Sequence, residues 1–378
     1  MNSELANKLL ASIMKWEPTK LAVERSVLEF MGSMKYDSYD RYMPGTRFMS
    51  SLVQWLNQIE EPEDRDELFS FVKHRLVFIS STQMNYLVDL LYDSIIRPML
   101  LKKATDKLAM PSYKLSNAKV QKEFAIQKRS SLVIGLSDGA HTDILRRSAG
   151  FSNEQVLTNY YPDEKKIKDM LSKLRKDMEK LGSDNQYFQS IYLIDDFTAS
   201  GKSFVRYEES DNDFHGKLAK IIGELCNLQE GAGTTHLSAL LNPESDTVEL
   251  DILFCMATDK ARDNIEESLT RYLNAKKDTL TKKVNCHIRI VQPLVKDISN
   301  DIRTDGKLNK VLENPKYIIK EYVMTDSYKV GKHDKPHLGF DECALPLVLA
   351  HNTPNNSLPI LWQDAKEFRG LFPRISRH

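Results

Sequence analysis

Apolar residues that recur three or four positions apart dominate the first part of the chain. Leu5, Leu9 and Ile13 form one such stripe. This spacing predicts amphipathic helices, and such helices need one another to bury their apolar sides. We therefore expect residues 1–128 to form a helical domain, with most of its aromatic side chains in a core or at an interface. A polar, tyrosine-rich stretch at residues 35–47 is predicted to be a loop that offers a contact surface.

Beyond this domain the pattern changes to short, continuous apolar runs separated by longer stretches with helical spacing. The runs lie at residues 132–136, 191–194 and 250–256, and a further strand is predicted at residues 285–294. Buried strands that alternate with helices are typical of an α/β fold with a doubly wound parallel sheet, which binds ligands at the carboxyl ends of its strands. We expect this core to occupy residues 129–300. The less regular remainder, residues 301–378, is predicted to be a third part.

Composition and charge narrow the classes of function. The chain has 53 basic and 53 acidic residues, so its net charge of zero gives no indication of nucleic acid or an anionic membrane as a partner. The four cysteines are scattered without metal-binding spacing, which favours reduced thiols over a zinc site. No apolar run is long enough to span a bilayer, and no signal sequence is evident. We therefore expect a soluble, cytoplasmic protein with no membrane partner.

The stretch from residue 190 to 204, SIYLIDDFTASGKSF, carries the densest chemistry. Its apolar run is predicted to be a strand that ends at two adjacent carboxylates, Asp195 and Asp196. Residues 197–203 then offer hydroxyl groups, backbone N–H groups and the start of a following helix. These groups together suit a phosphate dianion.

Gly201, Lys202 and Ser203 imitate the end of a P-loop. That motif requires a first glycine five residues before the second, and this position is Asp196. The spacing therefore argues against a P-loop.

The same stretch resembles the ribose-phosphate signature of the type I phosphoribosyltransferases. In that signature an apolar strand is followed by two acids, two variable residues, two threonine-like residues, a glycine, a variable residue and a serine or threonine. The resemblance implies that Asp195 and Asp196 are catalytic residues that hold the ribose 2′- and 3′-hydroxyls of phosphoribosyl pyrophosphate. It implies that the 5′-phosphate binds to Thr198, Ala199, Ser200, Gly201, Lys202 and Ser203. It also implies that the α/β core is a sheet of the type I phosphoribosyltransferase kind, accompanied here by the N-terminal helical domain.

An earlier strand ends in a tight turn, which is similar in position and form to the pyrophosphate loop of that family. The resemblance implies pyrophosphate binding by Ser137, Asp138, Gly139, Ala140 and His141. The helix expected from residue 142 or 143 would add charge through two arginines, at 146 and 147. An ordinary strand-to-helix turn with a solvated histidine is the alternative.

The C-terminal part ends in HNTPNNSLPILW, residues 351–362. This motif resembles the C-terminal motif of a divergent phosphoribosyltransferase-like family of effectors in bacterial conflict systems, some of them linked to retrons. By the first resemblance, residues 301–378 would be a hood-like segment packed on the core. The base or acceptor would bind to His351, Asn352, Asn355 and Asn356, although such groups are equally suited to making turns. His333 and His337 are not expected to share a metal, because Pro336 lies between them.

The family mechanism also implies a flap between the two loops, with Tyr160, Tyr161, Lys165 and Lys166 as candidates. It implies Mg²⁺ bound together with phosphoribosyl pyrophosphate, and we predict no metal site made directly by a cluster of protein ligands. Ala199 replaces the Asp that the 6-oxopurine branch uses at this position, which argues against salvage of hypoxanthine or guanine.

Two main functions follow from the sequence, and a binding protein with no phosphate site is a third possibility. The first is a phosphoribosyltransferase, a glycosyltransferase acting on pentosyl groups, that serves as an effector of antiphage defence. The second is a non-catalytic sensor of a nucleotide or of phosphoribosyl pyrophosphate. The sensor would act on a protein partner through the N-terminal helices. The sequence leaves open a homo-oligomer in either case.

Overall fold

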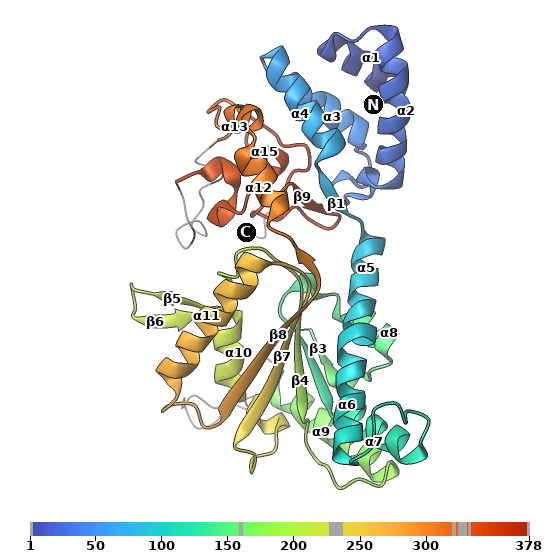
Figure 1. Cartoon of the computed structure of the whole chain (residues 1–378), viewed down its shortest axis with the longest axis vertical. Helices are drawn as coiled ribbons and strands as arrows, with labels where there is room; N and C mark the ends of the chain where they lie inside the picture. Colours follow the sequence, from blue (N-terminus) through green and yellow to red (C-terminus); the bar gives the residue numbers. More distant parts are fainter. Residues whose placement is uncertain are drawn as a thin grey trace. The chain divides into compact units, whose positions relative to one another are not determined.

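The computed structural model describes residues 3–158, 162–226, 237–319, 323, 331 and 334–375 (Figure 1). The chain divides into two compact units. The first contains Met1–Met84 and Val295–His378, and the second contains Asn85–Leu294.

This division differs from the three parts predicted from the sequence. Residues 85–128 belong to the α/β unit, and the two ends of the chain together form one unit. The expected helical domain over residues 1–128 is therefore not a domain of its own. The C-terminal segment, expected as a hood on the core, shares a unit with the N-terminal helices.

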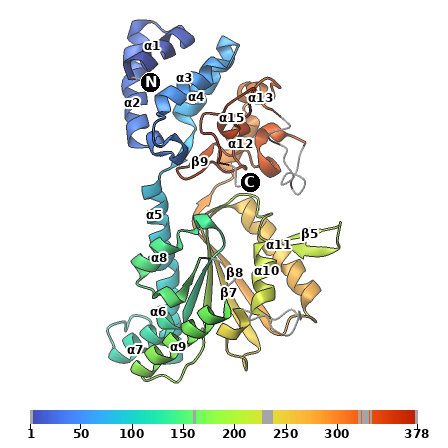
Figure 2. The same cartoon turned by 180° about the vertical axis from the view of Figure 1, so that it is seen from behind.

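A five-stranded parallel sheet forms the centre of the second unit (Figures 1 and 2). Its strand order is β3-β2-β4-β7-β8. The strands are β2 (Ser131–Gly135), β3 (Val156–Leu157), β4 (Ser190–Thr198), β7 (Thr247–Thr258) and β8 (Lys283–Leu294). The doubly wound parallel sheet predicted from the alternating pattern is thus confirmed.

Helices cover both faces of this sheet. One face carries Ile191 and Leu193 and packs against α9 (Glu164–Lys180), α10 (Lys217–Leu225) and α11 (Asp259–Lys276). On the other face lies α6 (Arg97–Lys107), from which Lys103 Nζ donates to Ser190 Oγ at 2.9 Å. Further helical elements of this unit are η3 (Leu91–Ile96), α7 (Ala118–Arg129) and α8 (Thr142–Ala149), and α5 (Ser81–Leu90) crosses the boundary between the two units at residue 85.

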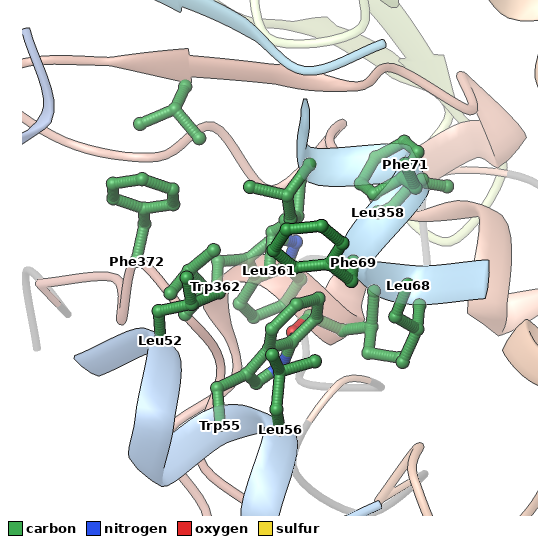
Figure 3. Close-up of a cluster of buried hydrophobic side chains, with 14 of the residues drawn as sticks. Leu52, Trp55, Leu56, Leu68, Phe69, Phe71, Leu358, Leu361, Trp362 and Phe372 are labelled. Carbon is green, nitrogen blue, oxygen red and sulfur yellow. The ribbon is translucent and has the colours of Figure 1, made fainter. Parts of the chain in front are cut away.

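In the first unit, one hydrophobic core joins the two ends of the chain. Leu52, Trp55 and Leu56 from α3 (Phe48–Asn57) and Leu68, Phe69 and Phe71 from α4 (Pro62–His74) pack with Leu358, Leu361, Trp362 and Phe372 (Figure 3). Strand β1 (Val77–Ile79) pairs in parallel with β9 (Leu347–Leu349). Further α-helices of this unit are α1 (Ser3–Met14), α2 (Pro18–Met34), α12 (Asp297–Thr304), α13 (Gly306–Leu312) and α15 (Pro359–Trp362).

The tyrosine-rich stretch at residues 35–47 belongs to this core. Tyr36, Tyr39 and Tyr42 are buried, and all three rings contact Phe372. The prediction of a contact surface was therefore wrong for these tyrosines, because their rings pack in the core and two of their hydroxyls form hydrogen bonds within the protein. Tyr39 donates to the carbonyl of Pro373 at 2.8 Å, and Tyr42 donates to that of Leu371 at 2.5 Å. Within the described residues, no helix is long and apolar enough to cross a membrane.

Candidate functional site

The acid pair lies inside strand β4 rather than after it. The sequence predicted a strand over residues 191–194 with the carboxylates in a turn. The observed strand continues to Thr198, because Asp195 pairs with Phe254 and Thr198 with Ala257 of the neighbouring β7. Successive residues of a strand point to opposite faces. Asp195 and Asp196 are therefore both buried but lie in different surroundings.

The predicted pyrophosphate loop follows β2, the strand next to β4. Ser137 donates a hydrogen bond from its hydroxyl to Asp195 Oδ1. A Cβ atom added at Gly139 would lie only 2.9 Å from Asp196 Oδ2, so the loop passes close to the second carboxylate at this glycine. The two predicted loops are thus brought together at the acid pair.

Their meeting point is the place where doubly wound sheets bind ligands. From β2 the chain moves to β3 on one side and then to β4 on the other, so the strand order reverses between β2 and β4. Ligands of open α/β sheets bind at the carboxyl ends of the strands that flank such a reversal. Ser137 follows the end of β2, and Asp195 lies in β4 one residue beyond Ile194, the partner of the last β2 residue.

Lys217, which the sequence did not single out, completes this cluster. Its Nζ lies 2.9 Å from Asp195 Oδ2 and 5.0 Å from the centre of the Phe204 ring. Lys217 is the first residue of α10, where acidic residues are usually preferred because of the helix dipole. The sequence feature that could have identified Lys217 is a lysine at this position, directly after Gly216.

Burial raises the pKa of Asp195 to about 6. The Lys217 ammonium opposes this effect, the charge of Asp196 adds to it, and the hydrogen bond from Ser137 lowers the pKa. Burial therefore outweighs the stabilisation of the charged form by Lys217 and Ser137.

The predicted phosphate loop is held by the start of α11. Thr258 Oγ1 donates to the Ala199 carbonyl at 2.6 Å, and Asn264 Nδ2 donates to the Ser200 carbonyl at 2.8 Å. Gly201 has a φ of +74°, and a Cβ atom there would lie 2.8 Å from the Ala261 carbonyl oxygen. Only glycine fits this turn without strain. Sequence reasoning missed both anchoring side chains because they lie about sixty residues further along the chain.

The helix expected directly after this loop begins later. A hairpin of β5 (Arg206–Glu208) and β6 (Asp213–His215) intervenes before α10. The first two N–H groups of α10 then donate to the carbonyls of Ser203 and Phe204, at 3.1 Å and 2.9 Å. The prediction that a helix N-terminus faces the phosphate was therefore wrong for these two groups. The N–H and hydroxyl groups of the loop itself remain.

The chain matches the family model PRTase-CE over residues 52–374. It belongs to the PRTase-CE family. The matched region contains both loops, all five strands of the sheet and the C-terminal motif. This confirms the predicted resemblance to a phosphoribosyltransferase-like family of conflict effectors. No curated protein and no solved structure matches the chain.

Of the residues expected near the phosphates of this PRTase-CE protein, His141 lies beside the acid pair. One of its ring nitrogens is within 4.8 Å of a carboxylate oxygen of Asp196, and its backbone is left-handed, with φ of +49°, directly before α8. Arg147 forms an ion pair with Asp143 at 2.6 Å on the exposed side of that helix, so its guanidinium has a carboxylate partner there. The flap candidates Tyr160 and Tyr161 lie outside the described residues, whereas Lys165 and Lys166 lie in the first turn of α9.

The residues expected to read the base lie in the first unit. The Asn352 side chain bonds to both the N–H and the carbonyl of Ile375, and Asn356 Nδ2 donates to the Phe340 carbonyl at 3.1 Å. These two amides therefore stabilise loops, which was the alternative that the sequence left open. A role of His351 and Asn355 in binding a base stays a prediction. His337 is buried, and His333 lies outside the described residues.

The hairpin brings together a set of side chains that the sequence did not predict. Glu208, Asp211 and His215 each offer a metal-ligating atom, and these atoms lie within 4.8 Å of one another. His215 Nε2 lies 2.6 Å from Asp211 Oδ2, and Arg206 Nε lies 2.6 Å from Glu208 Oε1. Internal partners therefore already satisfy part of this cluster.

Proposed function

We propose that this PRTase-CE protein binds phosphoribosyl pyrophosphate or a nucleotide at the carboxyl ends of β2 and β4. We further propose that it acts as a phosphoribosyltransferase. The observation that supports this most directly is the hydrogen bond from Ser137 to Asp195, because it joins the two loops that the family signature assigns to one ligand. A ligand held by both loops would have its anomeric carbon between them.

Each part of the site has a distinct task in this proposal. Asp195 and Asp196 accept hydrogen bonds from the ribose hydroxyls, and the loop at residues 198–203 binds the 5′-phosphate. The loop at residues 137–141 faces the pyrophosphate and stabilises the charge that develops as this group leaves. Holding both ends of the ligand fixes the anomeric carbon for attack, and fixed dipoles lower the barrier without reorganising.

Mg²⁺ fits this site as an ion carried by the substrate. Both oxygens of Asp195 already accept hydrogen bonds, from Ser137 and Lys217, so the pyrophosphate and ribose oxygens are the better ligands for the metal. When bound, the ion would neutralise charge on the departing pyrophosphate. Ser137 and Lys217 keep the carboxylate oriented throughout.

The acceptor differs from a 6-oxopurine in this proposal. Position 199, where that branch of the family has an Asp, is a buried alanine, 1% exposed. The side chains of residues 198–203 include no carboxylate that could take a proton from a purine ring. The same observation favours the alternative function, a sensor that binds ligand without consuming it.

A role in antiphage defence is part of the proposal, since the family consists of conflict effectors. A protein partner would then bind at the N-terminal helices. Helices α1 and α2 precede the region that the family model matches, which begins at residue 52. They are therefore features of this chain beyond the shared part.

The test is to incubate the full chain with phosphoribosyl pyrophosphate, bases and nucleotides, with and without Mg²⁺. Release of pyrophosphate or loss of a nucleotide is the expected result. The double variant Asp195→Asn with Asp196→Asn should abolish it, whereas Asp184→Asn, at an exposed position of the same unit, should not. Tight binding without consumption would replace the enzyme by the sensor. Unchanged ligand affinity in the double variant would refute the site itself.

A further inference from the structure

The hydrogen bonds around Asp195 leave one acceptor position of its carboxylate unused. Its side chain is 3% exposed. Oδ1 accepts from the Ser137 hydroxyl and from the Asp196 N–H at 3.2 Å, which uses both of its lone pairs. Oδ2 accepts from Lys217 at 2.9 Å and retains one lone pair. A ribose hydroxyl can therefore reach this carboxylate only beside the ammonium group of Lys217.

The backbone before α10 fixes the position of Lys217. Gly216 has a φ of +118°, and a Cβ atom there would lie 2.4 Å from the Phe204 carbonyl oxygen. The N–H of Lys217 donates to the Ser203 carbonyl at 3.1 Å. The last residue of the predicted phosphate loop and the lysine on the acid are thus joined by one hydrogen bond.

We propose that Lys217 is a positioning residue of the ribose site, which holds Asp195 ionised and oriented so that Oδ2 accepts a ribose hydroxyl. This inference rests on the proposed function, because it assumes that the acid pair binds ribose. It adds a residue that the family signature at 195–203 does not contain.

The groups that face Asp195 determine what loss of the lysine would do. They are Ser137 after β2, Asp196 on β4, Lys217 on α10 and the Cys255 thiol on β7. Burial raises the pKa of Cys255 well above its ordinary value, so this thiol stays neutral. Lys217 is then the one positive charge among these four groups, and it counters the effect of burial on the pKa of Asp195. Without it, Asp195 would take up a proton at a higher pH and would lose its role as an acceptor near neutrality.

The experiment measures binding of ribose 5-phosphate to the full chain by calorimetry, without metal, at about pH 7 and about pH 9, on either side of the expected titration. Lys217→Met should weaken binding about tenfold or more at the lower pH, equivalent to ~1.4 kcal/mol, and should recover most of it at the higher pH. Lys217→Arg should bind like the wild type at both values. Lys220→Met, which removes an exposed lysine from the same helix, is the matched control.

Two results would overturn the inference. One is wild-type affinity of Lys217→Met at both pH values. The other is an equal loss at both, since this would indicate a missing contact to the phosphate rather than a change in Asp195. Lys217→Gln, which keeps a hydrogen-bond donor without the charge, replaces the methionine variant if that variant does not fold.

A failure of the proposed function has a different signature. In that case the wild type itself would not bind ribose 5-phosphate. The carboxyl ¹³C signal of Asp195, assigned by its loss in Asp195→Asn, then tests the inference without ligand. It should titrate at a higher pH in Lys217→Met than in the wild type, and an unchanged titration would refute the role of the lysine.

Discussion

Replacing Thr258 with valine should loosen the predicted phosphate loop at a known cost. The Thr258 hydroxyl donates to the Ala199 carbonyl at 2.6 Å and accepts from the Ala261 N–H at 3.0 Å as the N-cap of α11. Losing an N-cap costs about 1 kcal/mol. Leaving a buried carbonyl without its donor costs about 1–3 kcal/mol more. We therefore expect Thr258→Val to lower the free energy of unfolding of the second unit by about 2–4 kcal/mol.

The distribution of tryptophan and cysteine makes it possible to follow the two units separately. The three tryptophans, Trp16, Trp55 and Trp362, all lie in the first unit. Cys255 lies in the second unit and is completely buried. Urea unfolding followed by tryptophan fluorescence therefore reports on the first unit. Labelling of Cys255, located by mass spectrometry, reports on the second.

In Thr258→Val, the labelling of Cys255 should shift to lower urea by about 1–2 M, given a denaturant slope of about 2 kcal/mol per M. The fluorescence transition should stay where it is. Thr258→Ser keeps the hydroxyl and should leave both transitions unchanged. A valine variant whose Cys255 labelling matches the wild type would refute the role given to this hydroxyl.

Three further predictions follow from buried or strained positions. Because the pKa of Asp195 is raised, its ionisation opposes folding. The free energy of unfolding of the wild type relative to Asp195→Asn should therefore fall as the pH rises from about 4 to about 6. Urea unfolding followed by circular dichroism measures this difference, and a difference that rises with pH would contradict the prediction. Gly201→Ala places a side chain against the Ala261 carbonyl at positive φ and should cost at least about 1–2 kcal/mol in the second unit, measured by Cys255 labelling; no loss would mean that the turn is not constrained. Phe372→Ala empties a fully buried ring position and should cost about 3–5 kcal/mol in the first unit by tryptophan fluorescence. Phe30→Asp, at a side chain that is 65% exposed, is its control, and equal losses in the two would contradict the core assignment.

Local patterns in the sequence were sufficient to predict the sheet and the acid pair. The apolar runs at residues 132–136 and 250–256 are buried strands, and Asp195 and Asp196 lie at the carboxyl end of the central one. Hydrophobic runs and a short signature are local properties, so they can be read without knowing what packs against them. The end of β4 was misplaced because β7 supplies partners as far as Thr198, which is a tertiary effect.

The features that the sequence did not reveal depend on distant partners. Lys217 reaches Asp195 across a hairpin, and that hairpin lies in a strongly polar stretch with little sign of a strand. The pairing of β1 with β9 joins residues such as Val77 and Leu347, which are far apart in the chain. Neither contact produces a periodic pattern of apolar residues in the sequence. The division into units could therefore not be predicted from the spacing of such residues.

The discontinuous first unit has a consequence for the order of folding during synthesis. Residues 85–294 form an unbroken segment, so the unit with the acid pair can fold as soon as this segment has left the ribosome. The helices that precede it must wait, because Leu358, Leu361, Trp362 and Phe372 complete their core and are made last. A chain cut short after β8 would therefore contain the whole second unit, with the acid pair, and N-terminal helices that lack the C-terminal part of their core.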